Sequence, residues 1–390
     1  MLGCTLVLGG CATLPRLEAP QIEGYEVAPS GFPDNVRFNG LDGDAYASLI
    51  SSSLRRDPRP TTPRGAVLAL SGGGAGGAFG AGVIVGLTRR NDRPVYDVVS
   101  GVSTGALAAP FAYLGPSWDH QLEAAFSGGW SNHLLKPSGV TSLFSTGLYR
   151  GGPLRNLVDH FVTPELVAAV AKEAASGRLL LVATTNLDTG ETVVWNMGVV
   201  AAVGGDRARA LFRDILVASS SVPGALPPVM ITVQHKGRSY EEMHVDGGVA
   251  IPFFVVSASQ SIANRPRPDV GVDVFVIVNG PLSATPTTTP RNTIAIARRS
   301  FTALLNQTVR SELLRVAALN TGRGPDLHYT ALPEGYGLAG SLEFDQAAMR
   351  RLFAFGAACA ATGKIWLSTI PEPHNGKMGL TPGSDSCPAQ

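Results

Sequence analysis

The sequence carries little charge, and the two signs nearly balance over the whole chain. Charged residues make up 16% of 390 residues, and the formal net charge is +1. Lysines and arginines are mostly scattered singly, and the pairs Arg89-Arg90, Arg298-Arg299 and Arg350-Arg351 fall in expected helices, where they suit a solvated face. No basic stripe is therefore available for a nucleic-acid partner. The chain also lacks the run of about 18 apolar residues that a membrane-spanning helix needs, any internal repeat, and the carboxylate-rich loop of a calcium site. We therefore expect no nucleic acid, transmembrane helix or calcium.

Cysteine is scarce and is not arranged as a metal site. The four cysteines are Cys4, Cys11, Cys359 and Cys387. None falls in a C-x-x-C pair or at a Cys/His spacing typical of zinc. Cys359 and Cys387 can form a disulfide in an oxidising compartment, although sequence alone does not give the pairing. No metal and no organic cofactor is implied.

The bulk composition indicates a large folded α/β protein. Hydrophobic residues make up 44% of the chain, which is enough for a sizeable core, and 46 glycines with 28 prolines indicate many loops. We favour one large domain over two smaller ones. The expected organisation is a signal segment at 1–11, a linker or N-terminal extension at 12–62, a folded domain at 63–370 and a flexible tail at 371–390.

The first residues are small and apolar and end at Leu8-Gly-Gly-Cys11. This segment resembles the lipobox of bacterial lipoproteins, although the positively charged n-region expected of a signal peptide is absent. The resemblance implies lipidation of Cys11 and, through Ala12, anchoring at the outer membrane on the periplasmic side of a bacterial cell envelope. The alternative is an N-terminus with an incidental cysteine.

The stretch from 95 to 110 has the form of a nucleophile elbow. A β-branched run predicts a buried strand, and the turn Gly101-Val-Ser103-Thr-Gly105 leads into the small apolar residues of a helix. The glycines are needed because side chains on either side of the serine would collide in so tight a turn. Ser103 would then stand at a helix N-terminus, where partial positive charge favours a developing oxyanion.

A glycine-rich loop precedes the elbow. A strand beginning near residue 63 runs into Ser71-Gly72-Gly73-Gly74, whose backbone N–H groups can approach an oxyanion closely. The same glycines match the dinucleotide-binding pattern G-x-G-x-x-G, with Asp97 at the spacing of its ribose-binding acid. That alternative gives no reason for the elbow, whereas an ester hydrolase does.

Four pieces in this order resemble the patatin-like phospholipase family. They are the glycine loop, the elbow, the serine-rich stretch 218–229, and Asp246-Gly247-Gly248. They fall between residues 66 and 248, about half of the chain. The resemblance implies a three-layer α/β sandwich with a mostly parallel central sheet, a lipid ester as substrate, and a role in lipid catabolism. One position departs from the family pattern: Gly76 stands where Lys or Arg is usual.

The resemblance also implies a two-residue site. Ser103 would attack the acyl carbonyl, Asp246 would take its proton, and Gly72, Gly73 and Gly74 would provide the oxyanion hole. A carboxylate is a weak base for serine, so the site must be poor in water.

Two alternatives remain open. The first is an α/β-hydrolase with a Ser-Asp-His triad, in which Asp246 or Asp273 pairs with His328 or His374. The second is a non-catalytic lipid-binding envelope lipoprotein. His244, two residues before Asp246, is expected to be structural.

Periodicity and breakers predict the remaining elements. Five aromatic residues between 114 and 152 either line an acyl-chain groove or complete the core: Trp118, Phe126, Trp130, Phe144 and Tyr149. The expected helices lie at 42–54, 152–175 with a break at Pro164, 206–217, 292–319 and 345–362, and the expected strands at 177–186, 189–195, 229–233, 239–245, 273–278 and 326–331.

Overall fold

A computed structural model gives the fold of the chain. It describes residues 16–20, 27–40, 48–49, 53, 64–129, 147, 149–255, 271–282, 288–319, 326–333, 336, 344–368 and 387. The expected signal segment with Cys11, most of the expected helix at 42–54, His374 and nearly all of the expected tail lie outside these residues.

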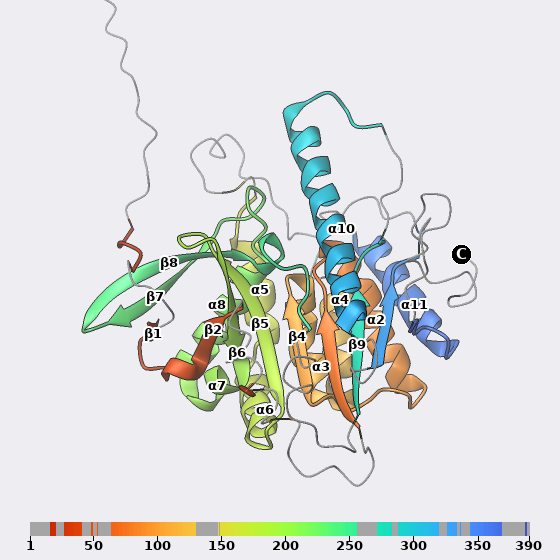
Figure 1. The fold of residues 1–390 in the computed structure, drawn as a ribbon, viewed down its shortest axis with the longest axis horizontal. Coiled ribbons are helices and arrows are strands. Elements are labelled where there is room, and N and C mark those ends of the chain that lie inside the picture. The colour runs from red at the N-terminus through yellow and green to blue at the C-terminus, as the bar shows by residue number, and fades with distance from the viewer. Residues whose placement is uncertain are drawn as a thin grey trace, which may run out of the picture.

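Five parallel strands form the centre of a single sheet (Figure 1). In spatial order they are β5 (Leu179–Asn186), β4 (Val98–Val102), β3 (Gly65–Leu70), β9 (Val272–Val278) and β10 (Asp326–Ala331). Their near-continuous apolar sequences suit strands that are covered on both faces. Because the strands are parallel, their carboxyl ends all meet at one edge of the sheet, which we call the carboxyl edge.

Antiparallel strands pair with β5 on both of its sides, β8 (Arg238–Asp246) on the side of β4 and β6 (Glu191–Asn196) on the other. Next to these lie β7 (Val229–His235), β1 (Ala28–Pro29) and β2 (Arg37–Asn39). The hairpin between β7 and β8 turns at Lys236 and Gly237, which both have positive φ. Strands β1 and β2 lie within the expected linker or N-terminal extension at 12–62 and bring residues 28–29 and 37–39 of it into the sheet.

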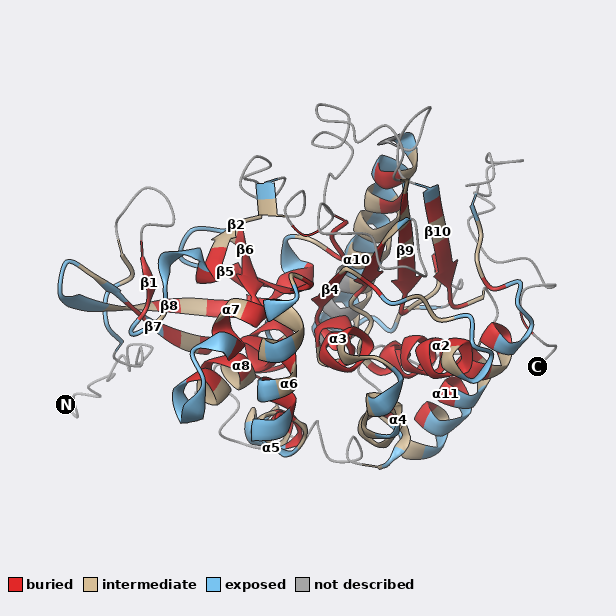
Figure 2. Cartoon of the chain, turned by 90° about the horizontal axis from the view of Figure 1, so that it is seen from below, coloured by how far each residue is buried: buried red, intermediate tan, exposed pale blue. Residues whose placement is uncertain are grey.

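Helices cover both faces of the sheet, which gives the expected three-layer α/β architecture (Figure 2). One face carries α2 (Gly77–Arg89), α3 (Thr104–Leu114), α4 (Asp119–Ser127), α5 (Gly152–Phe161), α6 (Pro164–Ala175), α7 (Met197–Ala202), α8 (Gly205–Ser219) and α11 (Gln346–Ala361). The other face carries α10 (Thr293–Leu319), whose Leu313 and Val316 are buried. Alternate residues of β3 belong to the two cores, as expected of a covered strand.

Two further expectations about the cysteines and about membrane helices can be compared with the structure. Cys359 of α11 and Cys387 form a disulfide, one of the pairings that the sequence allowed. Within the described part of the chain, no helix is both long and apolar enough to cross a membrane.

Candidate active site

Ser103 stands at a sharp turn between β4 and α3. Its backbone has φ 56° and ψ −126°, a conformation that non-glycine residues rarely adopt. A Cβ at Gly101 would lie 2.6 Å from the carbonyl oxygen of Gly105, and one at Gly105 would lie 2.4 Å from the carbonyl oxygen of Leu70. The turn therefore excludes side chains at both glycines while it holds the serine at the carboxyl edge.

Asp246 reaches Ser103 from a strand 143 residues further along the chain. The Ser103 hydroxyl donates to Asp246 Oδ2 at 2.6 Å, and the other carboxylate oxygen accepts from the Gly248 N–H at 2.7 Å. Both side chains are buried. Strand β8 ends at Asp246, opposite Thr184 near the end of β5, so the antiparallel pairing of β8 brings the carboxylate to the same edge as the serine.

Burial sets the electrostatics of this pair. It raises the pKa of Asp246 from 3.8 to about 7, although the hydrogen bonds from Ser103 and Gly248 act to lower it. A carboxylate with a pKa near neutrality is a stronger base than an ordinary one and still ionises at physiological pH. The arrangement can therefore accept the serine proton during an attack on an ester.

The serine-rich stretch holds both members of the pair in place. Ser219 Oγ accepts from the backbone N–H of Ser103 at 3.0 Å and donates to the carbonyl of Ala183 at 2.7 Å. Ser220 donates to the carbonyl oxygen of Ser103, and the carbonyl of Ser221 accepts from the N–H of Asp246 at 2.9 Å. In the sequence this stretch was notable only as part of a resemblance, whereas its hydrogen bonds show that it joins Ser103 to Asp246.

The glycine loop lies beside the serine. A Cβ at Gly72 would come within 3.2 Å of Ser103 Cβ, so backbone and serine are in close approach. The Gly72 N–H already donates to the carbonyl of Pro252, which removes Gly72 from the expected set of oxyanion donors. For Gly73 and Gly74, no hydrogen bond from the backbone N–H to another described residue is found. These two groups are therefore the available donors of the loop.

Asn279 fixes the loop, and nothing in the sequence indicated this. Its N–H donates to Ser71 Oγ at 2.8 Å, and its side-chain amide donates to the Ser71 carbonyl at 2.7 Å. Its own carbonyl oxygen lies 2.0 Å from where a Cβ at Gly76 would stand. The backbone of Asn279 thus fills the space that the family's Lys or Arg would need, which explains the glycine at position 76.

An apolar cavity adjoins the elbow. Its volume is about 50 Å³, several times the ~10–15 Å³ that one water needs. Thr104, the residue after Ser103, lines it together with side chains of α3, α4, α5, α6, α8 and α11. Phe126 is one of them, while Trp118 and Tyr149 pack on the core and Trp130 and Phe144 lie outside the described residues.

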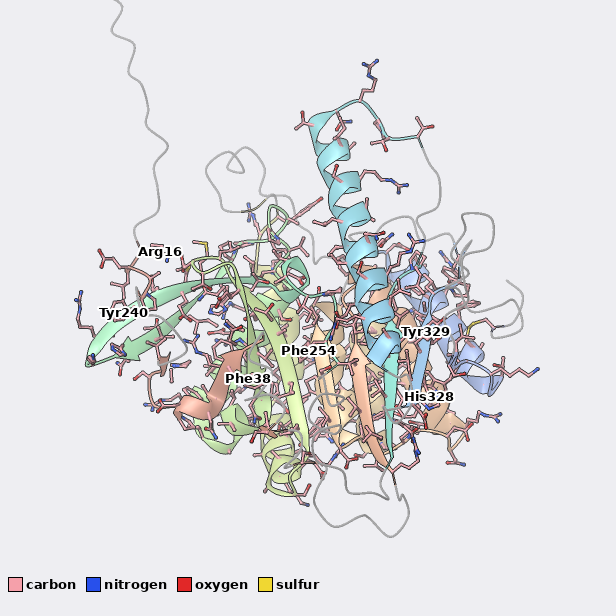
Figure 3. All side chains as sticks on the ribbon, viewed as in Figure 1. Arg16, Phe38, Tyr240, Phe254, His328 and Tyr329 are labelled. Carbon is pink, nitrogen blue, oxygen red and sulfur yellow. A yellow bond between two sulfur atoms is a disulfide. The ribbon has the colours of Figure 1, made fainter. Side chains whose placement is uncertain are left out.

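The histidines that a triad would require lie elsewhere. His328 faces Asp273, with Nε2 3.4 Å from Oδ1. Asp273 pairs with Ala66 near the start of β3, so this pair lies toward the amino edge of the sheet and not at the carboxyl edge, where Ser103 stands. Figure 3 labels His328 on β10. His244 is buried and bonded to Thr184 Oγ1 and Glu242, the structural role expected of it. Among the histidines that the structure describes, none contacts Ser103.

The dinucleotide-binding alternative is not supported by the position of Asp97. Asp97 Oδ2 accepts from the N–H of Ala66 at the start of β3, so it lies at the opposite edge from the glycine loop, where it could not bind a ribose. Within the described ranges, no group of three or more His, Cys, Asp or Glu side chains is placed to hold a metal ion.

Fold and geometry together define a class: a three-layer α/β protein with a nucleophile elbow whose serine is hydrogen-bonded to an aspartate. A match to a protein-family model identifies a family within this class. Residues 68–258 match the model described as "Patatin-like phospholipase", so this part of the chain is a patatin-like phospholipase domain. Comparison with curated protein sequences gave no significant match.

Several solved structures are similar at low sequence identity. VipD from Legionella pneumophila is 15% identical, with a TM-score of 0.38 over 74% of this chain and 66% of that one. Human GIVD cytosolic phospholipase A2 is 14% identical, with a TM-score of 0.31 over 66% and 48%. The type III effector protein ExoU is 12% identical, with a TM-score of 0.28 over 77% and 54%. The matches thus span about half to two thirds of the length of these proteins.

Proposed function

We propose that the chain is a serine acyl-ester hydrolase that acts on phospholipid or another lipid ester through a dyad of Ser103 and Asp246. The observation that carries the proposal is the 2.6 Å hydrogen bond between the two side chains, at an elbow and in a buried site. No third residue is required, because the carboxylate lies where a histidine would stand in a triad.

The proposed reaction has two halves. Ser103 Oγ bonds to the acyl carbon while Asp246 takes its proton, and the carbonyl oxygen becomes an oxyanion held by the N–H groups of Gly73 and Gly74, with Thr104 N–H as a further donor. The tetrahedral centre collapses, and the alcohol leaves with the proton from Asp246. Water then attacks the acyl-serine, gives its proton to Asp246, and releases the fatty acid as Ser103 regains a proton.

The cavity supports an acyl chain as the part of the substrate beside the serine. It begins at Thr104 and its lining is almost entirely apolar: Leu107, Phe111, Phe126, Leu157, Phe161 and Met349 are among its residues. Alkyl groups gain about 0.8 kcal/mol for each methylene that leaves water. A substrate with a hydrophobic acyl group would bind there better than a short polar ester.

Hydrolysis of a chromogenic short-chain ester and of phospholipid vesicles tests the dyad. We expect Ser103→Ala and Asp246→Asn to lower kcat by at least about 10³-fold, the order found for members of such sites. His328→Ala and His374→Ala serve as matched controls and should retain activity. Dependence on either histidine would instead indicate a triad, and a wild-type chain that cleaves no ester would leave the non-catalytic lipid-binding alternative.

Lipidation at Cys11, anchoring at the bacterial outer membrane and a role in lipid catabolism are further parts of the proposal. They are supported by the lipobox-like sequence Leu8-Gly-Gly-Cys11 and by the disulfide between Cys359 and Cys387, which suits an oxidising compartment. Metabolic labelling with an alkyne fatty acid would test the anchor, since Cys11→Ser should abolish incorporation.

A further inference from the structure

Exposed hydrophobic side chains of this protein gather at the carboxyl edge of the sheet. Eight large hydrophobic residues of the described chain are exposed: Leu17, Val95, Leu187, Val203, Val249, Ile296, Leu304 and Leu314. Single exposed residues need no explanation, but a cluster marks an interaction site. Five of the eight lie at or beyond the edge where Ser103 and Asp246 stand.

Three of the five are placed there by the strands. Leu187 follows the last residue of β5, and Val249 comes three residues after Asp246, at the end of β8. Leu17 lies beside the turn after β5, because its N–H donates to Glu241 and the neighbouring Arg16 pairs with Asp188. The chain therefore leaves the described structure toward residue 15 on this side of the molecule.

The other two lie on α10, which rises beyond the sheet (Figure 1). Its lower half is anchored by buried Leu313 and Val316, and a Cβ at Gly248 would lie 3.8 Å from Leu305 Cδ2. Leu304 is 58% exposed and Ile296 is 52% exposed. Ile296 lies eight residues before Leu304, which places it about 12 Å further along the helix axis from the site, at 1.5 Å per residue. The helix thus carries apolar side chains from the mouth of the site outward.

The charge of the same segment identifies its partner. Residues 291–306, which include the upper half of α10, contain three arginines, Arg291, Arg298 and Arg299, and no aspartate or glutamate. Exposed apolar side chains with arginines and without acidic residues are typical of helices that lie in the interface of a membrane with anionic headgroups.

We infer that the carboxyl edge, with the upper half of α10, docks on an anionic phospholipid bilayer and presents the mouth of the site to it. The role of docking in substrate access rests on the proposed function, whereas membrane binding itself does not. A lipid attached at Cys11 would place the same side toward the membrane, because residue 16 already lies there.

Vesicle cosedimentation tests the docking in a chain carrying Cys11→Ser and Ser103→Ala, so that neither an anchor nor catalysis contributes. We expect binding to phosphatidylcholine vesicles that contain phosphatidylglycerol, weakened by salt and by Arg291→Gln. Adding Ile296→Gln and Leu304→Gln should reduce the partition coefficient by about tenfold or more. Val95→Gln with Val203→Gln is the matched control, since these side chains are similarly exposed away from this edge.

Equal binding by the α10 double variant and its parent, or an equal loss in the control, would overturn the inference. With Ser103 intact, the α10 variant should keep its activity on a soluble short-chain ester and lose hydrolysis of vesicle phospholipid. If the vesicle experiments give the expected result but the chain cleaves no ester, the proposed function is refuted and the docking inference is retained. If the chain cleaves esters but the α10 double variant binds vesicles as well as its parent, only the docking inference is refuted.

Discussion

At the scale of single residues, the site depends on one carboxylate whose surroundings alter its chemistry. Asp246 is buried, and burial raises its pKa to about 7. The base must be ionised to take the proton of Ser103, so activity requires a pH above this pKa. An unperturbed aspartate would already be ionised at pH 5.

The pH profile of kcat/KM follows from this shift. On a neutral short-chain ester we expect activity to be low at pH 5, to rise with a midpoint near pH 7 and to level off above it. Because ionisation of a carboxyl group has almost no enthalpy, the midpoint should stay constant between 15 and 35 °C, whereas an imidazole base would shift it. A midpoint near pH 4, or one that moves with temperature, would contradict a buried aspartate as the base.

Ser219 offers a second prediction, as a positioning residue. Its hydroxyl is the acceptor for the N–H of Ser103, so Ser219→Ala leaves that buried N–H without a partner, at about 1–3 kcal/mol. We expect kcat to fall about tenfold with KM nearly unchanged, and Ser219→Thr to restore most of it. Ser221→Ala is the control, because Ser221 Oγ donates to the carbonyl of Val217 in the last turn of α8 and not to the dyad. An equal loss in both variants would indicate a general packing effect.

At this scale, residues in local motifs could be predicted from the sequence, and residues that act through distant contacts could not. Ser103 and Asp246 could be identified because each lies in a short motif whose glycines are set by local backbone geometry. The roles of Ser219 and Asn279 could not, since they depend on hydrogen bonds to residues more than 100 positions away. The expected donor role of Gly72 was wrong for the same reason, because its N–H is taken by Pro252.

At the scale of elements, the site depends on how closely two helices pack. Helix α2 starts at Gly77, directly after the glycine loop, and lies against α11. A Cβ at Gly356 of α11 would lie 2.2 Å from the carbonyl oxygen of Phe79 in α2. The two backbones approach each other at a distance that only glycine permits, so α11 helps to set the position of the loop.

Gly356→Ala should therefore affect both stability and catalysis. The added methyl group must push α2 and α11 apart, and overpacking of this kind costs about 1–3 kcal/mol. We expect a lower midpoint in urea unfolding and a reduced kcat, because α2 carries the loop with it. Gly152→Ala is the control, since a Cβ there meets nothing within 4 Å. Unchanged unfolding in Gly356→Ala would show that the helices can separate freely.

The long elements were predictable from periodicity. The sequence predicted the strands of the parallel centre and helices α5, α6, α8, α10 and α11 to within a few residues, because each has a sustained apolar pattern or ends at proline or glycine. Strands β1 and β2 have two and three residues and no period of their own. They become strands only because β7 and β6 offer free edges, and such long-range pairing leaves no local signal.

At the scale of the whole molecule, the segment before the family-matched domain is part of the folded unit. Arg37 of β2 is buried and forms an ion pair with Glu242 of β8, which is also bonded to His244. Burial acts to raise the pKa of Glu242, but the hydrogen bonds from His244 and Arg37 outweigh it and lower the pKa to about 2. The carboxylate is therefore held ionised by a residue that lies outside the expected domain boundary at 63.

A chain that begins at residue 64 should be markedly less stable than one that begins at residue 16. Removal of Arg37 leaves Glu242 with an uncompensated charge in a buried position, and breaking a buried ion pair from one side costs about 3–5 kcal/mol. We expect the shorter chain to unfold at lower urea or to be insoluble, and Arg37→Ala in the longer chain to reproduce much of the loss. Because β8 ends at Asp246, the loosened strand should also lower ester hydrolysis. Equal unfolding midpoints for the two chains would show that residues 27–40 lie on the sheet without stabilising it.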